Sequence, residues 1–523
     1  MNNSKFTFID LFSGIGGFRM ALNSLGGDCL NFSEINNDAI NTYCTNFNEE
    51  IDYNLGDITK IKTLPKHDLL TGGVPCQSWS IAGKNLGFDD DRGQLWNDTL
   101  YLLHQSKPKA FIFENVKGLV DPRNKAAFAY ILERIKEAGY FANYYLLNSY
   151  DYGVPQNRLR IYIVGFREKA FAAKFKLPKP INIKTQLSDI LSHFNTDSNA
   201  EIKADFNPKL MGEKVDKKPK STELNAQRSM SLSSNNGLND YFLFNDLRNG
   251  HSTIHSWDIL ETTERQKSIC YLLLKNRRKS AYGNMDGNPL SIKHLQSLDP
   301  SVKQAELDDL IKMDILKIEY FSFLINKFNA EKANEKELEL LKYHEDNYLN
   351  MDVLKSNRDL KLKGISISKT IKTLLEKNII TGKEIRYEFK NTKISTGLFG
   401  INRIFLPTSN IFPTLVASDT NDYITLKNID AKNEDDYKAQ FIEDVYKKDN
   451  YRKITKREAC LIQGFPMDFI LPENRSRWMK LLGNSVSVPV IETLGKAIVE
   501  TGVFDAEEAV DIMENHEKMA LKS

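Results

Sequence analysis

The feature that most constrains the fold of this chain is a regular alternation of short apolar runs and amphipathic stretches over residues 6–166. Short apolar runs bounded by glycine or polar residues predict strands, and apolar residues at helical spacing predict amphipathic helices. The expected strands are 7–12, 28–34, 68–74, 109–114, 141–148 and 160–166, and the expected helices are 17–25, 37–47, 96–106 and 124–138. Alternation of this regularity predicts the α/β class, with a doubly wound and largely parallel sheet.

The remainder of the chain lacks this alternation. Residues 205–240 are rich in Lys, Ser, Asn and Pro, which predicts a loop or linker. Residues 300–390 combine many Lys and Glu residues with Leu and Ile at helical spacing, which predicts exposed helices. A last helical run, 486–501, has apolar positions suited to packing back on the sheet. With 523 residues, the chain is long enough for two or more lobes.

Composition limits the compartment and the partners. The formal net charge is only +2, so affinity for a polyanion has to come from local clusters of basic residues. The five cysteines are scattered, with no Cys-x-x-Cys pair, which favours a reducing compartment over a disulfide scaffold or a zinc site. The amino-terminal apolar stretch is too short for a secretion signal, and no run approaches the roughly eighteen apolar residues of a membrane span. We therefore expect a cytoplasmic protein and, since His251 and His255 have no third ligand beside them, no metal site.

A glycine-rich turn with Phe12, Gly14 and Gly16 closes the first expected strand. Glycines allow a sharp turn and the close approach of a ligand, and the N-terminus of the following helix favours negative charge. Glu34, after the next strand, has the spacing of an acid that hydrogen-bonds ribose hydroxyls. These residues predict a nucleoside cofactor, although a nicotinamide dehydrogenase would satisfy the glycine turn as well. Asp57 either faces the adenine or simply caps a helix.

Cys76 follows the third expected strand, on a turn that Pro75 stiffens. In open α/β sheets, ligands bind outside the carboxyl ends of the strands, so a thiol at this place is well positioned for chemistry. A small buried thiol that only packs is the competing interpretation.

Two further strands carry polar residues at their ends. One buried strand ends in Glu114 and Asn115. A buried carboxyl group is costly unless it has a hydrogen-bond partner or a catalytic role in proton transfer. Gln156, Arg158 and Arg160 alternate at the start of the last strand, so we expect them on one face. They suit a carbonyl oxygen or a phosphate, unless the strand end is merely surface. A thiolate, a neutral acid and an arginine together activate a pyrimidine at C6, which makes C5 nucleophilic enough to accept a methyl group.

Taken in order, these motifs resemble those of the DNA (cytosine-5)-methyltransferases of bacterial restriction–modification systems. The shared motifs are Phe12-x-Gly14-x-Gly16, Pro75-Cys76-Gln77, Glu114-Asn115-Val116, Gln156-x-Arg158-x-Arg160, Arg457-Glu458-Ala459 to Gln463-Gly464-Phe465-Pro466, and Gly483-Asn484-Ser485-Val486. The resemblance implies a Rossmann-like sheet of an S-adenosylmethionine-dependent methyltransferase and a second, large α+β target-recognition domain. It places the catalytic domain at 1–170 plus 482–523 and the target-recognition domain at 171–481.

The resemblance also implies how the cofactor is bound. S-adenosylmethionine would be the methyl donor, held by Phe12, Gly14, Gly16, Glu34, Asp57, Ile58, Leu95, Asn484 and Val486. One departure is visible, because many relatives carry a Trp after the ribose-binding acid and this chain has Ile35 there.

The catalytic roles are carried over in the same way. Cys76 would attack C6 of a cytosine flipped out of duplex DNA. Glu114 would be the acid near N3, and Arg160, with Arg158, would lie near O2. Asn115 and Gln156 would be positioning residues, and Gln77 and Ser80, at a loop that resembles the one closing over DNA, would contact the substrate.

Residues 171–481 are expected to read double-stranded DNA. The candidate contacts are Arg248, Asn249 and Arg403, because Arg reads guanine or anchors phosphates and Asn reads adenine. A basic cluster at a helix end is the competing interpretation. A restriction endonuclease would be a functional partner without direct contact, and a monomer is the default for the family. The alternative is a tRNA methyltransferase of the same chemistry, whose recognition region is typically much shorter. An oxidoreductase, or an inactive homologue that only binds partners, leaves Cys76 and the groups around it without a use.

Overall fold

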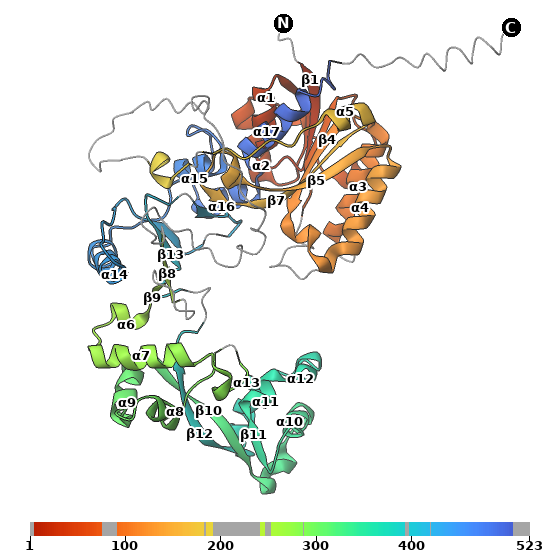
Figure 1. The fold of residues 1–523 in the computed structure, drawn as a ribbon. Coiled ribbons are helices and arrows are strands. Elements are labelled where there is room, and N and C mark those ends of the chain that lie inside the picture. The colour runs from red at the N-terminus through yellow and green to blue at the C-terminus, as the bar shows by residue number, and fades with distance from the viewer. Residues whose placement is uncertain are drawn as a thin grey trace, which may run out of the picture.

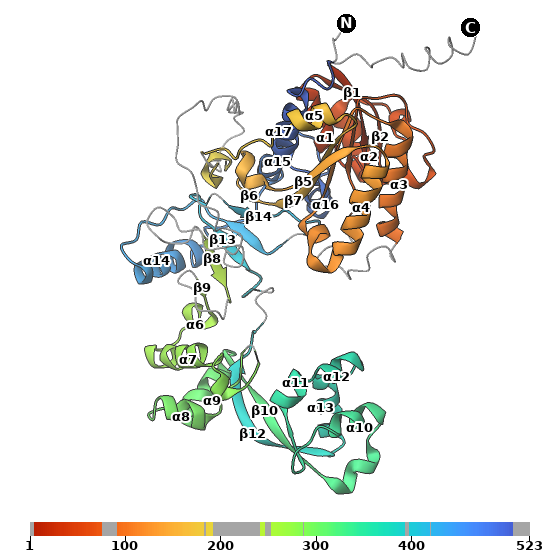
Figure 2. The same ribbon diagram turned by 45° about the vertical axis from the view of Figure 1, so that its right-hand side comes forward.

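The computed structural model describes residues 5–75, 91–182, 185–191, 241–245, 253–285, 287–392, 397–409, 411–418 and 420–505. A six-stranded sheet with its helices lies at one end of the molecule, and a lobe of helices with a smaller sheet lies at the other (Figure 1). A short sheet lies between the two ends, and it remains there when the view is turned (Figure 2).

The six-stranded sheet has the order β2-β1-β3-β4-β7-β5. Its strands are β1 (Phe6–Leu11), β2 (Gly27–Ser33), β3 (Leu69–Gly73), β4 (Ala110–Val116), β5 (Phe141–Asn148) and β7 (Leu159–Phe166). The pairs β1–β2, β1–β3 and β3–β4 are parallel, whereas β7 runs antiparallel between β4 and β5. All six expected strands are present, and the predicted α/β class with a largely parallel sheet is confirmed.

Helices cover both faces of this sheet. They are α1 (Gly17–Ser24), α2 (Asn37–Phe47), α3 (Asp91–Ser106), α4 (Lys125–Glu137) and α17 (Val488–Val499). Alternate residues of β1 point to opposite faces. Phe8 shares one core with Leu22 of α1 and Leu494 of α17, and Ile9 shares the other core with Leu100 of α3. The last described helix thus returns to the sheet and lies against α1 (Figure 1), as its apolar pattern predicts.

Two helices that precede α17 in the chain belong to the same end of the molecule: α15 (Lys456–Gln463) and α16 (Arg475–Asn484). Buried Glu458 fixes the start of α15, because its carboxylate accepts from the N–H of Thr455 over 2.8 Å and from both terminal nitrogens of Arg452 over 2.7 and 2.8 Å. Ile462 of α15 and Leu482 of α16 are buried in the core that also holds α1 and α17.

The connecting sheet has the order β15-β13-β8-β9. Its strands are β8 (Tyr241–Phe244), β9 (Thr253–Ile254), β13 (Arg403–Phe405) and β15 (Asp422–Ile424), and α14 (Glu434–Gln440) packs on it. The rings of Phe242 and Phe441 stack 3.7 Å apart in this core. A two-residue strand, β14 (Phe412–Pro413), pairs with β6 (Gln156–Asn157) and so joins this region to the first sheet.

The far lobe is an insertion between β9 and β13. Its three-stranded antiparallel sheet, β11-β10-β12, consists of β10 (Leu316–Ile325), β11 (Tyr348–Asn350) and β12 (Ile380–Phe389). Its helices are α6 (Ser256–Ile259), α7 (Glu264–Asn276), α8 (Ile292–Leu298), α9 (Gln304–Lys312), α10 (Glu335–Leu341), α11 (Met351–Ser356), α12 (Arg358–Leu362) and α13 (Ile367–Glu376).

The prediction of helices alone for residues 300–390 was incomplete, because β10 and β12 lie there. In β10, Lys317 and Glu319 alternate with Ile318 and Tyr320, a two-residue period typical of a strand. The high density of Lys and Glu is also typical of a solvated helix, which is why the sequence pattern indicated helices here. A further short helix, α5 (Lys169–Lys174), follows β7.

Of the helices in the described part of the chain, none is long and apolar enough to cross a membrane. The described residues also contain no group of three or more His, Cys, Asp or Glu side chains placed to hold a metal ion.

Candidate active site

The carboxyl ends of β1, β3 and β4 meet at one edge of the sheet, because these strands are parallel neighbours. The glycine turn follows β1, Pro75 follows β3, and Glu114 and Asn115 lie at the end of β4. Cys76 comes next after Pro75 in the sequence, which predicts a thiol at this edge. The roles of the following residues stay predictions, because they lie outside the described residues: Cys76, Gln77, Ser80, Arg248 and Asn249.

The glycine turn is tied directly to Glu34. The backbone N–H of Gly14 donates to Oε2 of Glu34 over 2.9 Å. Phe12, Gly14 and Gly16 have positive φ angles of 52°, 55° and 86°. A Cβ on Gly16 would lie 2.2 Å from the ring of Phe47, so only glycine fits there. A Cβ on Gly14 would meet nothing within 4 Å, so there is open space beside the turn, as a bound ligand requires.

The acid predicted to bind ribose is held by the start of α2. Oε1 of Glu34 accepts from the N–H groups of Ile35 and Asn36, each over 2.8 Å. The side chain of Ile35 is 72% exposed, which leaves an apolar surface next to the carboxylate. An adenine ring placed over Ile35 would remove that surface from water. The residues present therefore fit a nucleoside cofactor.

Asp57 caps a short helical turn in the structure. Its Oδ1 accepts from the N–H and the hydroxyl of Thr59 over 3.0 and 2.8 Å, and these hydrogen bonds lower the pKa of Asp57. Asn54 links this segment to Glu34, since its side chain accepts from the N–H of Glu34 over 3.1 Å and donates to its carbonyl over 3.0 Å. The helix cap, one of the two roles that the sequence allowed for Asp57, is therefore present. The other role, contact with the adenine, stays a prediction.

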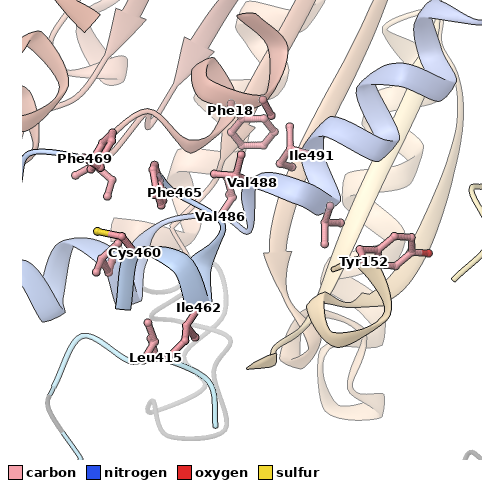
Figure 3. Close-up of a cluster of buried hydrophobic side chains, with 14 of the residues drawn as sticks. Phe18, Tyr152, Leu415, Cys460, Ile462, Phe465, Phe469, Val486, Val488 and Ile491 are labelled. Carbon is pink, nitrogen blue, oxygen red and sulfur yellow. The ribbon is translucent and has the colours of Figure 1, made fainter. Parts of the chain in front are cut away.

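Val486 brings the carboxyl-terminal segment to the same edge. A Cβ on Gly17 would lie 2.7 Å from Cγ2 of Val486. A Cβ on Gly73 would lie 3.8 Å from Cγ1 of Val486 and 3.9 Å from Oε2 of Glu114. The start of α1 and the end of β3 thus lie beside Val486, and the end of β3 also lies beside Glu114. Figure 3 shows Val486 among the buried side chains near Phe465.

The other predicted cofactor contacts differ in exposure. Ile58 is buried beside Asp57, Leu95 is half-buried in α3, and Asn484 is exposed at the end of α16. The side-chain amide of Asn484 is exposed two residues before Val486, so it can bind a ligand without disturbing packing within the protein.

Glu114 and Arg160 form an ion pair on the neighbouring strands β4 and β7. Nε of Arg160 lies 3.1 Å from Oε1 of Glu114. Burial raises the pKa of Glu114, while the positive charges of Arg160 and Arg158 act in the opposite direction. A carboxyl group whose pKa is raised by burial is suited to donating a proton to a ring nitrogen. Asn115 donates from Nδ2 to the carbonyl of Val74 over 3.1 Å, so it holds the chain two residues before Cys76.

The expectation that Gln156, Arg158 and Arg160 share one face is corrected by the structure. Arg158 lies between the separate strands β6 and β7, so strand alternation does not apply to it. Its guanidinium is buried and donates to the carbonyls of Leu415 and Gly483 over 3.1 Å each, and of Ser485 over 2.6 Å. Arg160, and not Arg158, contacts Glu114. Both terminal nitrogens of Arg158 donate to backbone carbonyls, whereas its buried Nε has no hydrogen-bond partner among the described residues, and its place near O2 of the cytosine stays a prediction.

Gln156 is likewise buried and donates to Oε1 of Gln463 over 2.9 Å and to the carbonyl of Ile462 over 3.2 Å. Gln463, to which the sequence assigned no role, donates to the carbonyls of Ser485 and Val486 over 3.0 and 3.1 Å. In the sequence, Gln463 is recognisable only as a polar amide at the apolar end of α15. That pattern does not show which groups it hydrogen-bonds. These contacts support the predicted role of Gln156 as a positioning residue.

Arg403 begins β13 of the connecting sheet. Its guanidinium forms two hydrogen bonds with the buried carboxylate of Asp422, over 2.7 and 3.1 Å. Removing the arginine would leave a buried carboxylate unpaired, which is costly. Arg403 therefore stabilises the connecting sheet, and its contact with DNA stays a prediction.

Comparison with known proteins finds relatives that match most of the chain. The family model described as C-5 cytosine-specific DNA methylase matches residues 6–282 and 305–500. A Type II methyltransferase of Herpetosiphon aurantiacus, M.HgiBI, is 39% identical over 504 residues, which cover 96% of this chain and 99% of the relative. M.BanI, a Type II methyltransferase of Aneurinibacillus aneurinilyticus, is 30% identical over 509 residues, which cover 95% of this chain and 97% of the relative. Among solved structures, a mutant of Spodoptera frugiperda DNMT2 matches with a TM-score of 0.43 and 16% identity, over 94% of this chain and 99% of that chain.

The sheet order, the glycine turn with its acid and the buried acid of β4 define the sheet of an S-adenosylmethionine-dependent methyltransferase. The chain belongs to the C-5 cytosine-specific DNA methylase family. It is a DNA (cytosine-5)-methyltransferase, its methyl donor is S-adenosylmethionine, and DNA is its substrate.

Proposed function

We propose that this chain is the modification methyltransferase of a Type II restriction–modification system, and that it methylates a cytosine flipped out of duplex DNA. The observation that carries the site is the buried Glu114–Arg160 pair at the strand ends, next to the segment that leads into Cys76. M.HgiBI and M.BanI, which each match nearly the whole chain, are both named as Type II methyltransferases, and this supports the biological role.

In the proposed reaction, the thiolate of Cys76 forms a bond to C6 of the cytosine. Glu114, whose pKa burial raises, donates a proton to N3, and Arg160 stabilises the exocyclic oxygen O2 and the charge left on Glu114. The ring becomes electron-rich at C5. S-adenosylmethionine supplies the electrophilic methyl group when bound. The proton on N3 then returns to Glu114, a base removes the C5 proton, and the Cys76 thiolate leaves, which restores the aromatic ring and releases the product.

We further propose that the cofactor is held by the residues that the family motif identifies. They are Phe12, Gly14, Gly16, Glu34, Asp57, Ile58, Leu95, Asn484 and Val486. The open space at Gly14, the exposed Ile35 and the convergence at Val486 support this assignment.

The proposed catalytic domain comprises residues 1–170 and 482–523, and residues 171–481 form the proposed target-recognition domain. The apolar core of the first sheet also includes Phe412, Ile462 and Trp478, which supports a firm attachment between the two parts. Gln77, Ser80, Arg248 and Asn249 remain proposed DNA contacts. A cytoplasmic location, a monomeric state and a cognate restriction endonuclease that does not bind this chain are parts of the same proposal.

Trapping of the covalent adduct tests the function. The purified protein is incubated with tritium-labelled S-adenosylmethionine and duplex DNA that contains 5-fluorocytosine, which blocks the loss of the C5 substituent. We expect a labelled protein–DNA adduct that survives denaturing electrophoresis and disappears in Cys76→Ala. Sequencing of the trapped DNA identifies the target. An adduct with fluorocytidine-containing tRNA, and none with DNA, would contradict the proposal and favour the tRNA alternative.

A further inference from the structure

A two-residue turn in the connecting region carries an aromatic side chain in an unusual backbone conformation. Leu398 and Ile401 form a reciprocal pair of backbone hydrogen bonds, both over 2.8 Å, around Phe399 and Gly400. Phe399 has a φ of 49° and Gly400 a φ of 81°. Positive φ at both central residues is the geometry of a type I′ turn, which favours Asn-Gly or Gly-Gly. A phenylalanine in the first of these positions is strained.

The turn is anchored so firmly that it has little freedom to relax. Leu398 and Ile401 are buried in the core of the connecting sheet, together with Phe242. A Cβ on Gly397, which precedes the turn, would lie 1.8 Å from the carbonyl oxygen of Ile401. Asn391 holds the same glycine by donating to its carbonyl oxygen over 2.7 Å. The two flanking residues thus fix the direction in which the tip projects.

The contacts of the Phe399 ring within the described part of the chain do not offset this strain. Its side chain is 61% exposed, and among the described residues no aromatic ring or cation stacks on it. An exposed phenylalanine is disfavoured by the hydrophobic effect, and glycine or asparagine would relieve the backbone as well. A residue that is unfavourable to the folded chain on both counts, on a rigid tip, indicates a role in binding.

We propose that Phe399 is a wedge that enters the duplex DNA and stacks against a base step beside the flipped cytosine. The turn leads directly into β13, in the sheet that lies between the catalytic end and the inserted lobe (Figures 1 and 2). Apolar side chains that proteins insert between base steps unstack the bases, and flipping leaves a gap that an aromatic ring can fill. This inference rests on the proposed role of residues 171–481 in target recognition.

The test uses Phe399→Gly and Phe399→Asn in the full-length protein, with Phe328→Ala as the matched control. Phe328 is 97% exposed in the inserted lobe and has no positive φ. The DNA is a duplex that contains the target sequence found by methylation mapping. It carries 2-aminopurine next to the target cytosine, and the fluorescence of 2-aminopurine rises when this base loses its stacking. For both variants of Phe399 we expect a melting temperature equal to or above that of the wild type, about tenfold weaker binding of the target duplex and a reduced fluorescence rise. Phe328→Ala should behave as the wild type in all three measurements.

Direct contact is tested with a benzophenone side chain introduced at position 399. Irradiation should crosslink the protein to bases next to the target, whereas the same group at position 328 should not. Unchanged binding and fluorescence in the Phe399 variants would overturn the wedge. A clear loss of thermal stability would also overturn it, because the ring would then be supported by contacts within the chain. Methylation by the wild type is measured first, so that failure of the proposed function is separated from failure of this inference.

Discussion

Arg158 and Gln463 donate to the same backbone carbonyl, that of Ser485, over 2.6 and 3.0 Å. Both side chains are buried. Arg158 also holds the carbonyl of Leu415, which follows β14, and Gln463 also holds the carbonyl of Val486. One hydrogen-bonded junction therefore fixes the segment predicted to bind the cofactor and the segment that follows β14, which lies within the proposed recognition domain.

Gln463→Leu should weaken cofactor binding several-fold. The substitution leaves the buried carbonyl of Val486 without its hydrogen bond from Gln463 and removes one of the two hydrogen bonds that the amide of Gln156 donates, at a cost to stability of about 1–3 kcal/mol. Kd for S-adenosylmethionine and the urea unfolding curve check this. Gln296→Leu is the matched control, because Gln296 donates to the carbonyl of Val302 in the inserted lobe. It should lose stability but keep the affinity for the cofactor. Equal cofactor affinity in both variants would contradict the positioning role.

Glu114→Gln should reduce the rate of methyl transfer by about 10²–10⁴-fold, the range typical of a lost general acid. The amide keeps the shape of the side chain but has no acidic proton for N3. Single-turnover rates at saturating DNA and S-adenosylmethionine measure the chemical step. Glu388→Gln is the control, because Glu388 is another buried acid paired with an arginine, Arg277, over 2.8 Å. A rate loss of the same size in Glu388→Gln would show that the effect is general disruption.

Ile35→Trp should tighten the binding of S-adenosylmethionine. Ile35 is exposed beside Glu34, and an indole offers a larger ring face to the adenine. Stacking of this kind contributes about 0.5–1.5 kcal/mol, which corresponds to roughly two- to twelvefold in Kd. Titration of the protein with S-adenosylmethionine measures the change, and Ile51→Trp, at another exposed isoleucine, is the control. An unchanged Kd for Ile35→Trp would place the adenine elsewhere.

Asp10→Asn should stabilise the protein at pH 8 more than at pH 5. Asp10 is fully buried in β1, and burial raises its pKa from 3.8 to about 7. Since the folded state then holds this proton more tightly than the unfolded state, wild-type stability falls as the pH rises from about 4 to about 7. Asparagine removes this titration and can still accept from the hydroxyl of Thr71, which donates to Asp10 over 3.1 Å. Each unit of pKa shift corresponds to about 1.4 kcal/mol. Urea unfolding of the protein at both pH values measures the difference, and a pH-independent effect of the substitution would contradict the prediction.

Much of the catalytic sheet was predictable, because its signals are local. Strand and helix periods recur over a few residues, and the glycine turn and the acid of β4 each lie within one short motif. The strands β10 and β12 were not predicted, and the cause is local as well. Their many charged residues are typical of an exposed helix, so the two-residue period of a strand was not recognised. The expected common face of Gln156, Arg158 and Arg160 was wrong, because β6 ends at Asn157 and β7 begins at Leu159, and such an interruption between strands leaves little trace in the sequence.

By itself, the sequence determined the order of the strands along the chain, the type of chemistry and the family, because these depend on residue types at short spacing. Only the tertiary structure decided which arginine pairs with Glu114 and which polar side chains join distant segments of the chain. Arg160 lies on Glu114, whereas Arg158 reaches carbonyls more than 250 positions away in the sequence, and Arg403 pairs with Asp422. A buried polar group takes whatever partner the fold brings within hydrogen-bond distance, and that partner is set by packing between distant segments. The same holds for Phe399, whose strain and exposure exist only because Leu398 and Ile401 are anchored in a core built from both ends of the recognition region.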